Sequence, residues 1–148
     1  MKLRQKAGLV IATLATAAGT AVLTAPTAAA DDGNVYAFDG SHFDGAYCSW
    51  DGPDANWANC SGGGVSRNLR NQASSLWNNG FAGAQEVVNF YWDTGYQGAW
   101  ACLGHGDAWE NLPSGDRVFS WGSDRGGYWE NINNNISSHK WVDFCGQA

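Results

Sequence analysis

A pattern of amide and hydroxyl side chains occurs twice in the sequence, once in each half. Both copies, at residues 68–75 and 131–138, read asparagine, aliphatic, any residue, asparagine, any residue, aliphatic, serine, serine. Amide and hydroxyl oxygens are neutral ligands for hard cations such as Ca²⁺, and the same residue types also form turns. The repeat therefore indicates a duplicated structural unit whose two copies either bind a cation or close equivalent turns.

No spacing typical of a catalytic site accompanies this pattern. His42, His105 and His139 are far apart in the sequence, and neither His-x-His nor His-Glu-x-x-His occurs. A Gly-x-Ser-x-Gly elbow and a phosphate-binding glycine loop are also missing. The compact group Gly104–Asp107 combines a histidine with a carboxylate and is typical of a turn. We therefore expect a protein that is not an enzyme.

The elements that would position these residues are predicted to be strands. The chain has nine Trp, five Tyr, six Phe and 20 Gly, and short aromatic segments alternate with turn-forming residues. We expect no regular helix: residues 69–77 fit a helical turn or a loop, and residues 31–34 are expected to be disordered. The predicted strands are Tyr47–Trp50, Glu86–Trp92, Trp100–Leu103, Val118–Trp121 and Lys140–Phe144.

The N-terminal segment has the features of an export signal. Lys2 and Arg4 give a basic start, an apolar run follows over 7–23, and Ala28–Ala30 offers the small residues that signal peptidase accepts. This predicts a signal peptide at 1–30, cleavage after Ala30, and a secreted, extracellular protein.

The remaining part of the chain is strongly acidic. It contains all 14 acidic residues but only five basic ones, which gives a net charge of 5 − 14 = −9. This charge argues against nucleic acid and anionic membranes as partners. Residues 31–148 have the length of one compact domain, which we expect to be a monomer. The five basic residues are Arg67, Arg70, Arg117, Arg125 and Lys140.

The chain has four cysteines, Cys48, Cys60, Cys102 and Cys145. An even number in an exported chain predicts disulfides, and four cysteines allow three pairings. We favour Cys48–Cys60 and Cys102–Cys145, because each bridge then stays within one half of the chain. Zinc is disfavoured, because no Cys-x-x-Cys pair occurs.

Tyr91, Tyr96 and Gly98, together with the repeated Asn/Ser pattern, resemble the Greek-key signature of the βγ-crystallin family. The resemblance implies an all-β fold, with two Greek-key motifs forming a βγ-crystallin-like β-sandwich. We assign residues 31–45 to an N-terminal extension and 46–148 to the domain, with motif one at about 46–79 and motif two at about 84–145. The counterpart of the Tyr91–Gly98 hairpin in motif one is either Trp50 with Trp57, which we prefer, or Phe38, Phe43 and Gly45.

The resemblance also implies two calcium sites between the motifs. Carried onto this sequence, their side-chain ligands would be Asn71, Ser74, Asn134 and Ser137. These ligands include no carboxylate, so the expected affinity is low, and Arg70 would place a cation near one site. Calcium is accordingly the one cofactor expected.

The chain also resembles the secreted bacterial, crystallin-like metallopeptidase inhibitors, through the phrase Ala73–Asn78. This resemblance implies a non-enzymatic inhibitor of an extracellular protease, with an exposed loop as the contact. The loop between Cys48 and Cys60, or the stretch Pro113–Tyr128, could serve, although nothing in the sequence identifies a scissile bond. The alternatives are a calcium-binding structural or stress-protective βγ-crystallin and a wall-carbohydrate-binding module that uses exposed indoles. The indoles in polar loops are Trp57, Trp109 and Trp129.

Overall fold

The computed structural model describes residues 31–148, so the predicted signal peptide lies outside the described residues. This part is all-β, and its only helical pieces are four short 3-10 turns. None of the helical pieces in residues 31–148 has the length or apolarity to cross a bilayer. The 3-10 turns are η1 (Ser41–Phe43), η2 (Trp57–Asn59), η3 (Thr94–Tyr96) and η4 (Leu112–Ser114).

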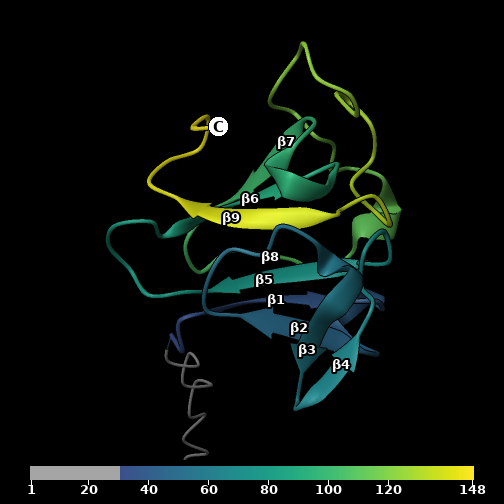
Figure 1. The fold of residues 1–148 in the computed structure, drawn as a ribbon, viewed down its shortest axis with the longest axis vertical. Helices are drawn as coiled ribbons and strands as arrows, with labels where there is room; N and C mark the ends of the chain where they lie inside the picture. Colours follow the sequence, from purple (N-terminus) through teal and green to yellow (C-terminus); the bar gives the residue numbers. More distant parts are fainter. Residues whose placement is uncertain (1–30) are drawn as a thin grey trace, which may run out of the picture.

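Two antiparallel sheets lie one above the other in Figure 1. The first has the order β2–β1–β5–β8, and the second has the order β7–β6–β9. A two-stranded hairpin of β3 and β4 extends from the first sheet (Figure 1). The strands are β1 (Asn34–Phe38), β2 (Tyr47–Trp50), β3 (Cys60–Gly62), β4 (Val65–Arg67), β5 (Ser75–Asn79), β6 (Val87–Tyr91), β7 (Trp100–Leu103), β8 (Ala108–Trp109) and β9 (Ser138–Val142).

Each half of the chain contributes backbone to the sheet of the other half. β8 comes from the second half but pairs with β5 of the first half, with Leu76 opposite Trp109. In return, Asp54 of the first half forms a bridge with His139 in β9 of the second half. Two interlocked Greek-key motifs thus form a β-sandwich, which confirms the predicted fold class.

Alternation along the strands places one side of each sheet in the core. In β1, Val35 and Ala37 are buried while their neighbours are half-buried. The core between the sheets also contains Leu76 of β5, Phe90 of β6 and the fully buried Trp57 of η2. The large aromatic load therefore fills a small interior, as aromatic residues do in compact β domains.

The N-terminal part of the domain differs from the prediction. Residues 31–45 were expected to be an extension, yet β1 is an inner strand of the first sheet and pairs with both β2 and β5. Residues 32 and 33 are held as well, because both donate backbone hydrogen bonds to the carbonyl of Asn79. Motif one therefore begins at β1, and the expectation of disorder over 31–34 was wrong.

The preferred counterpart of the second hairpin was also wrong. The ring centroids of Phe38 and Phe43 lie 5.6 Å apart across a folded turn in which Gly45 has a φ of 82°. Tyr91 and Tyr96, the corresponding pair in motif two, stand 5.9 Å apart. Trp50 and Trp57 instead stack on each other, at 4.7 Å, against the core.

The remaining predictions divide between confirmed strands and revised ones. Tyr47–Trp50 and Trp100–Leu103 have the predicted bounds, whereas Val118–Trp121 forms only isolated bridges in a long connection. For the 69–77 segment, predicted to be a helical turn or a loop, the loop is right up to residue 74, whereas Ser75 onward is strand β5. The structure pairs Cys48 with Cys60 and Cys102 with Cys145, as favoured.

Candidate functional site

The two copies of the Asn/Ser pattern meet across the sandwich and are related by an approximate twofold. Asn71 has a φ of 57° and donates its backbone N–H to the carbonyl of Ile136 at 2.8 Å. Asn134 has a φ of 59° and donates to the carbonyl of Ala73 at 3.0 Å. Asparagine tolerates this left-handed conformation better than most residues, which explains its place at both turns.

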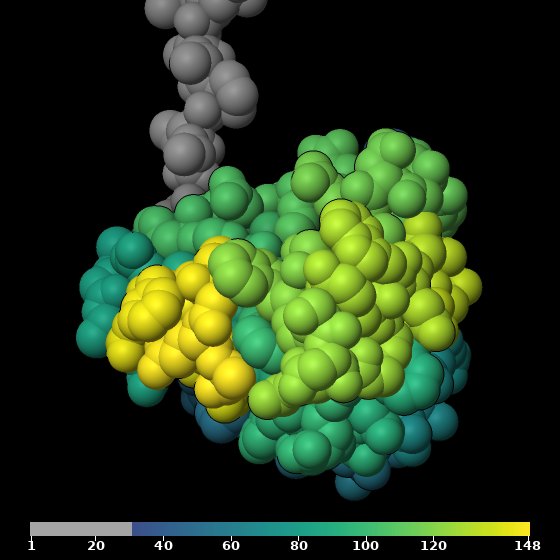
Figure 2. Space-filling model, turned by 90° about the horizontal axis from the view of Figure 1, so that it is seen from above, coloured from purple at the N-terminus to yellow at the C-terminus, as the bar shows by residue number. Residues whose placement is uncertain are grey.

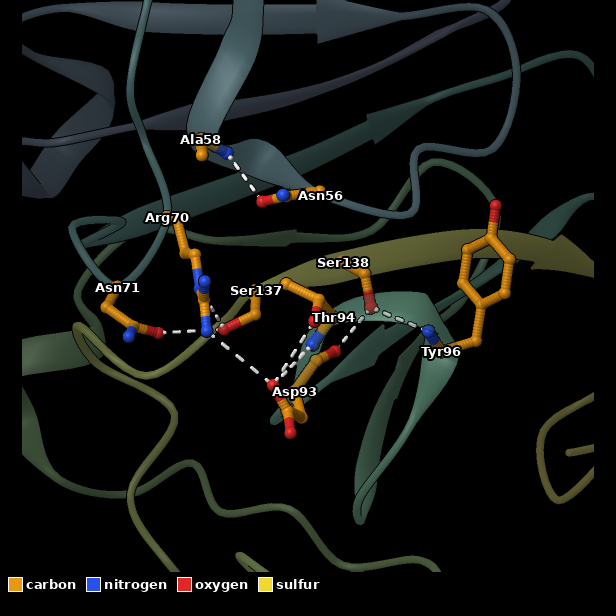
Figure 3. A network of polar contacts seen from close by, with 9 residues as sticks. All are labelled: Asn56, Ala58, Arg70, Asn71, Asp93, Thr94, Tyr96, Ser137 and Ser138. Carbon is orange, nitrogen blue, oxygen red and sulfur yellow. Dashed lines mark hydrogen bonds and ion pairs between the residues drawn. The ribbon is translucent and has the colours of Figure 1, made fainter.

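The last serine of each copy locks a folded hairpin. Ser75 Oγ accepts a hydrogen bond from the backbone of Phe43 and donates to the carbonyl of Gly40 at 2.7 Å. Ser138 Oγ accepts from Tyr96 in the same way, and it donates to the carbonyl of Asp93 at 2.6 Å (Figure 3). These two serines are therefore structural, because buried hydroxyls need such partners.

The first predicted calcium site contains a guanidinium group. Ser137 Oγ donates to Asn71 Oδ1 at 3.0 Å, and Arg70 Nε donates to Ser137 Oγ at 3.4 Å. Arg70 Nη2 also lies 3.6 Å from Asp93 Oδ1, so the cation has a carboxylate partner (Figure 3). These residues do not fit a calcium ion, since a metal here would face a fixed positive charge.

The second predicted site has a different composition. Asn133 stands where Arg70 stands in the first copy, so no guanidinium is present. Ser74 is buried. The backbone N–H of Asn134 donates to the carbonyl of Ala73, the residue before Ser74, so the Asn134 turn lies beside Ser74. Asn133 Oδ1 is buried and has no hydrogen-bond partner, which is the kind of group that an ion or a water satisfies. This donor set fits a weakly bound hard cation.

The four predicted ligands thus fall into two groups, Asn71 with Ser137 and Asn134 with Ser74, and each group draws on both motifs. The sequence analysis included Arg70 but missed Asp93, its partner, and Asn133. Asp93 lies in the other motif, directly before η3, so no local spacing could reveal it. Asn133 is visible only when the two copies are aligned residue by residue.

Of the three histidines, only His139 is buried, and it belongs to the core. Trp57 Nε1 donates to His139 Nδ1 at 2.8 Å, so the ring proton is on Nε2, which donates to the carbonyl of Gly52 at 2.9 Å. Complete burial lowers the pKa of His139 to about 4, against the weaker opposing effect of that carbonyl contact. The imidazole is therefore a neutral packing group at neutral pH.

The loop between Cys48 and Cys60 has little freedom to enter a protease cleft. Asp54 exchanges two backbone hydrogen bonds with His139, and Ala55 accepts one from Gly95 at 2.8 Å. Trp57, one of the three loop indoles considered for the carbohydrate-binding alternative, is fully buried and donates its backbone N–H to the carbonyl of Ser137. The middle of this loop is therefore tied by its backbone to the second motif, although most of its side chains are exposed.

The stretch Pro113–Tyr128 is exposed and braced. Trp121 exchanges two backbone hydrogen bonds with Trp100 of β7, and Phe119, within the stretch, is fully buried in the core. Arg125 lies over the ring of Trp100, at 5.0 Å. This stretch belongs to the long connection that rises above the second sheet in Figure 1.

A third exposed segment, which the sequence analysis missed, is the β3–β4 hairpin. Cys60, at the start of β3, is tied to Cys48, and Gly63 and Gly64 form a two-residue turn with φ of 60° and 78°. Val65 follows the turn and is 55% exposed. Gly62–Gly64 was the available signal, because paired glycines favour a two-residue hairpin turn.

Comparison with a solved βγ-crystallin domain agrees with this architecture. A βγ-crystallin domain studied for the evolution of the eye-lens fold is 19% identical, covers 76% of this chain and 87% of its own, and gives a TM-score of 0.50. An archaeal βγ-crystallin is 17% identical, with coverage of 74% and 96% and a TM-score of 0.48. Spherulin 3a from Physarum polycephalum is 18% identical, with coverage of 80% and 90% and a TM-score of 0.48. At such identities the likeness concerns the fold alone.

The sequence itself carries a more specific relationship. A search of curated proteins found no match. A family profile, in contrast, matches residues 24–103, which is more than half of the chain and spans both the β3–β4 hairpin and the Asn71 turn. On this evidence the chain belongs to peptidase inhibitor family I36.

Proposed function

We propose that this protein is exported after loss of residues 1–30 and inhibits an extracellular peptidase through its β3–β4 hairpin. The observation that carries this proposal is the exposed Val65 on a disulfide-tied hairpin inside the family-matched segment. A protease cleft binds an extended segment, and a rigid segment loses little conformational entropy on binding.

The outer edge of β4 supports this role. Among residues 31–148, β4 pairs with β3 only, with Ser61 opposite Ser66. In this register the backbone N–H and C=O of Ser66 point away from β3. They are therefore available to the backbone of a partner strand, and the neighbouring Val65 supplies an apolar side chain.

The base of the hairpin is rigid. A Cβ at Gly62 would lie 2.0 Å from the carbonyl oxygen of Tyr47, so the β3 backbone packs directly against β2. Cys60 is almost fully buried and is bridged to Cys48 of β2. The geometry of the edge is thus set before any partner arrives.

The test is inhibition of a thermolysin-like and a subtilisin-like peptidase by the secreted protein and by Val65→Asp. A carboxylate at this position would have to be desolvated in an apolar subsite, so we expect the inhibition constant to rise at least about tenfold. Phe144→Asp is the matched control, because Phe144 is also exposed, at 62%, and lies in the C-terminal tail. Equal inhibition by all three proteins would rule out the hairpin, and no inhibition of either enzyme would rule out this function.

A second proposal is weak calcium binding at the Ser74/Asn134 site only. It is supported by the unpartnered, buried Asn133 Oδ1 and by the presence of Arg70 at the other site. Bound calcium would supply no chemistry beyond joining the two motifs. Neutral ligands without a carboxylate imply a low affinity.

Calcium binding is tested by thermal unfolding in millimolar calcium and in chelator. A ligand at about ten times its Kd stabilises by about 1.4 kcal/mol, so we expect a small upward shift in Tm that Asn134→Ala abolishes. Arg70→Asn should lower stability in chelator by about 0.2–1 kcal/mol, the range for a partly exposed ion pair. The same variant should bind a second ion in calorimetry, and an unchanged stoichiometry would contradict the assignment of Arg70 as the blocking cation.

A further inference from the structure

Five aromatic rings form a continuous surface on the outer side of the first sheet. Alternation places them opposite the core: Tyr36 pairs with Trp77 across β1 and β5, whereas their neighbours Ala37 and Leu76 are fully buried. Each of the five is only partly buried. We call this surface the aromatic face, and its members are Tyr36, Phe38, Phe43, Tyr47 and Trp77.

The rings of the aromatic face contact one another without a break. Tyr36 and Trp77 have centroids 5.4 Å apart and planes at 24°. The ring centroid of Phe38 lies 5.5 Å from that of Tyr47 and 5.6 Å from that of Phe43. The ring of Phe43 in turn contacts that of Trp77, with centroids 6.4 Å apart. Mutual packing of this kind fixes the side chains, so little ordering is needed when a ligand binds.

The second sheet carries an equivalent surface, but the protein covers it. Tyr91 and Trp100, which correspond to Phe38 and Tyr47, are only 1% and 5% exposed. The long connection and the C-terminal tail lie over this sheet and account for most of the face shown in Figure 2. The Cys102–Cys145 bridge and the bridge from Trp121 to Trp100 attach these two covers. The rings of the aromatic face, in contrast, are all partly exposed, although the β3–β4 hairpin touches them at Tyr47, where a Cβ at Gly62 would lie 2.8 Å from the ring.

The charges around the aromatic face are negative. Tyr36 donates its hydroxyl to Asp32, and Asp39 and Asp44 accept backbone hydrogen bonds in the hairpin that carries Phe43. Burial and the bond to Asp32 raise the pKa of Tyr36 to about 12, so its hydroxyl stays neutral. The four cation–ring contacts found in residues 31–148 all involve other rings.

We infer that the aromatic face binds a neutral polysaccharide. The flat C–H faces of sugars pack on aromatic rings, and sugar hydroxyls donate hydrogen bonds to carboxylates such as Asp32, Asp39 and Asp44. The acidic rim and the net charge of −9, from five basic and 14 acidic residues, disfavour anionic polymers, anionic membranes and a second copy of the same acidic chain. The site differs from the three loop tryptophans first considered, of which Trp57 is buried.

The test is depletion of the secreted protein from solution by insoluble chitin and by cellulose, compared with Trp77→Ala. Trp77 packs on Tyr36 and Phe43 of the aromatic face and lies outside the buried core, so its removal leaves the core packing in place. We expect the dissociation constant on at least one polymer to rise about tenfold or more. Trp129→Ala is the matched control, because Trp129 is 64% exposed and lies in the long connection. It should bind as the unchanged protein does.

Three readouts keep this inference separate from the inhibitor proposal. Thermal unfolding confirms that both variants are folded, and Trp77→Ala should retain peptidase inhibition while Val65→Asp retains polymer binding. Sedimentation should give a monomer for each protein. The inference is overturned if neither polymer is bound, if both tryptophan variants bind equally, or if Trp77→Ala converts a dimer into a monomer, since the aromatic face would then join two copies.

Discussion

At the residue scale, His139 is a titratable group whose pKa is strongly changed by folding. Its ring lies beneath Trp50 and Trp57 and satisfies the indole N–H of Trp57. Protonation would place a proton on the nitrogen that accepts this bond and a charge in the core. The neutral imidazole is thus a structural acceptor rather than a candidate base.

The pH dependence of stability follows from this environment. The pKa of His139 is about 4 in the folded protein and 6.5 in the unfolded chain, so the unfolded state binds more protons between these values. The free energy of unfolding should therefore fall as the pH drops from about 6.5 towards 4, by about 3 kcal/mol in total. Urea unfolding at pH 7 and pH 4.5 measures this.

Two variants assign the effect. His139→Gln lacks the titrating group, so the loss between pH 7 and pH 4.5 should shrink, whatever the variant's own stability. His42→Gln changes an exposed histidine and should keep the full loss. The same loss in both variants would place the proton uptake elsewhere.

At the element scale, the folded hairpins depend on glycines with positive φ. Gly45 has a φ of 82°, and a Cβ there would lie 2.1 Å from Asp39 Oδ1, the atom that accepts from the backbone of Ala46. Gly64, in the β3–β4 turn, has a similar φ of 78° but no neighbouring atom within 4 Å of its Cβ position. A substitution at Gly64 therefore adds backbone strain alone, whereas one at Gly45 adds both backbone strain and a steric clash.

The substitution Gly64→Ala should cost about 1 kcal/mol, the strain of a left-handed residue. Gly45→Ala carries the same strain and also displaces the Asp39 carboxylate, so we expect a loss of at least about 2 kcal/mol. Urea unfolding of both variants at neutral pH gives the comparison. Equal losses would mean that Asp39 moves away without cost.

Local patterns predicted some elements and not others. Trp100–Leu103 is an apolar run bounded by turn residues and was found with its bounds. Val118–Trp121 has the same appearance, yet its backbone partners are spread over Trp100, Glu130 and Asn131, so it bridges without forming a strand. β1 was missed, because its role as an inner strand depends on pairing with β5, which lies beyond the whole β3–β4 hairpin in the sequence.

At the scale of the whole molecule, the repeat gave the Greek-key fold but not the partners of its residues. The Asn71 and Asn134 turns are visible as a spacing, because each lies within one short segment. The contact of Arg70 with Asp93 and that of Trp57 with His139, which are distant in the sequence, arise only when the sheets pack. Duplicated sequence therefore predicts the scaffold, while the chemistry of each site depends on where the two copies have diverged.

The exchange of backbone between the halves limits how the duplicated protein can change. β8 completes the sheet of the first motif, and Asp54 extends the sheet of the second. Deleting either copy would strip a backbone partner from the survivor, so we expect that neither half folds alone. A substitution on either side of this shared seam therefore acts on the packing of both repeats.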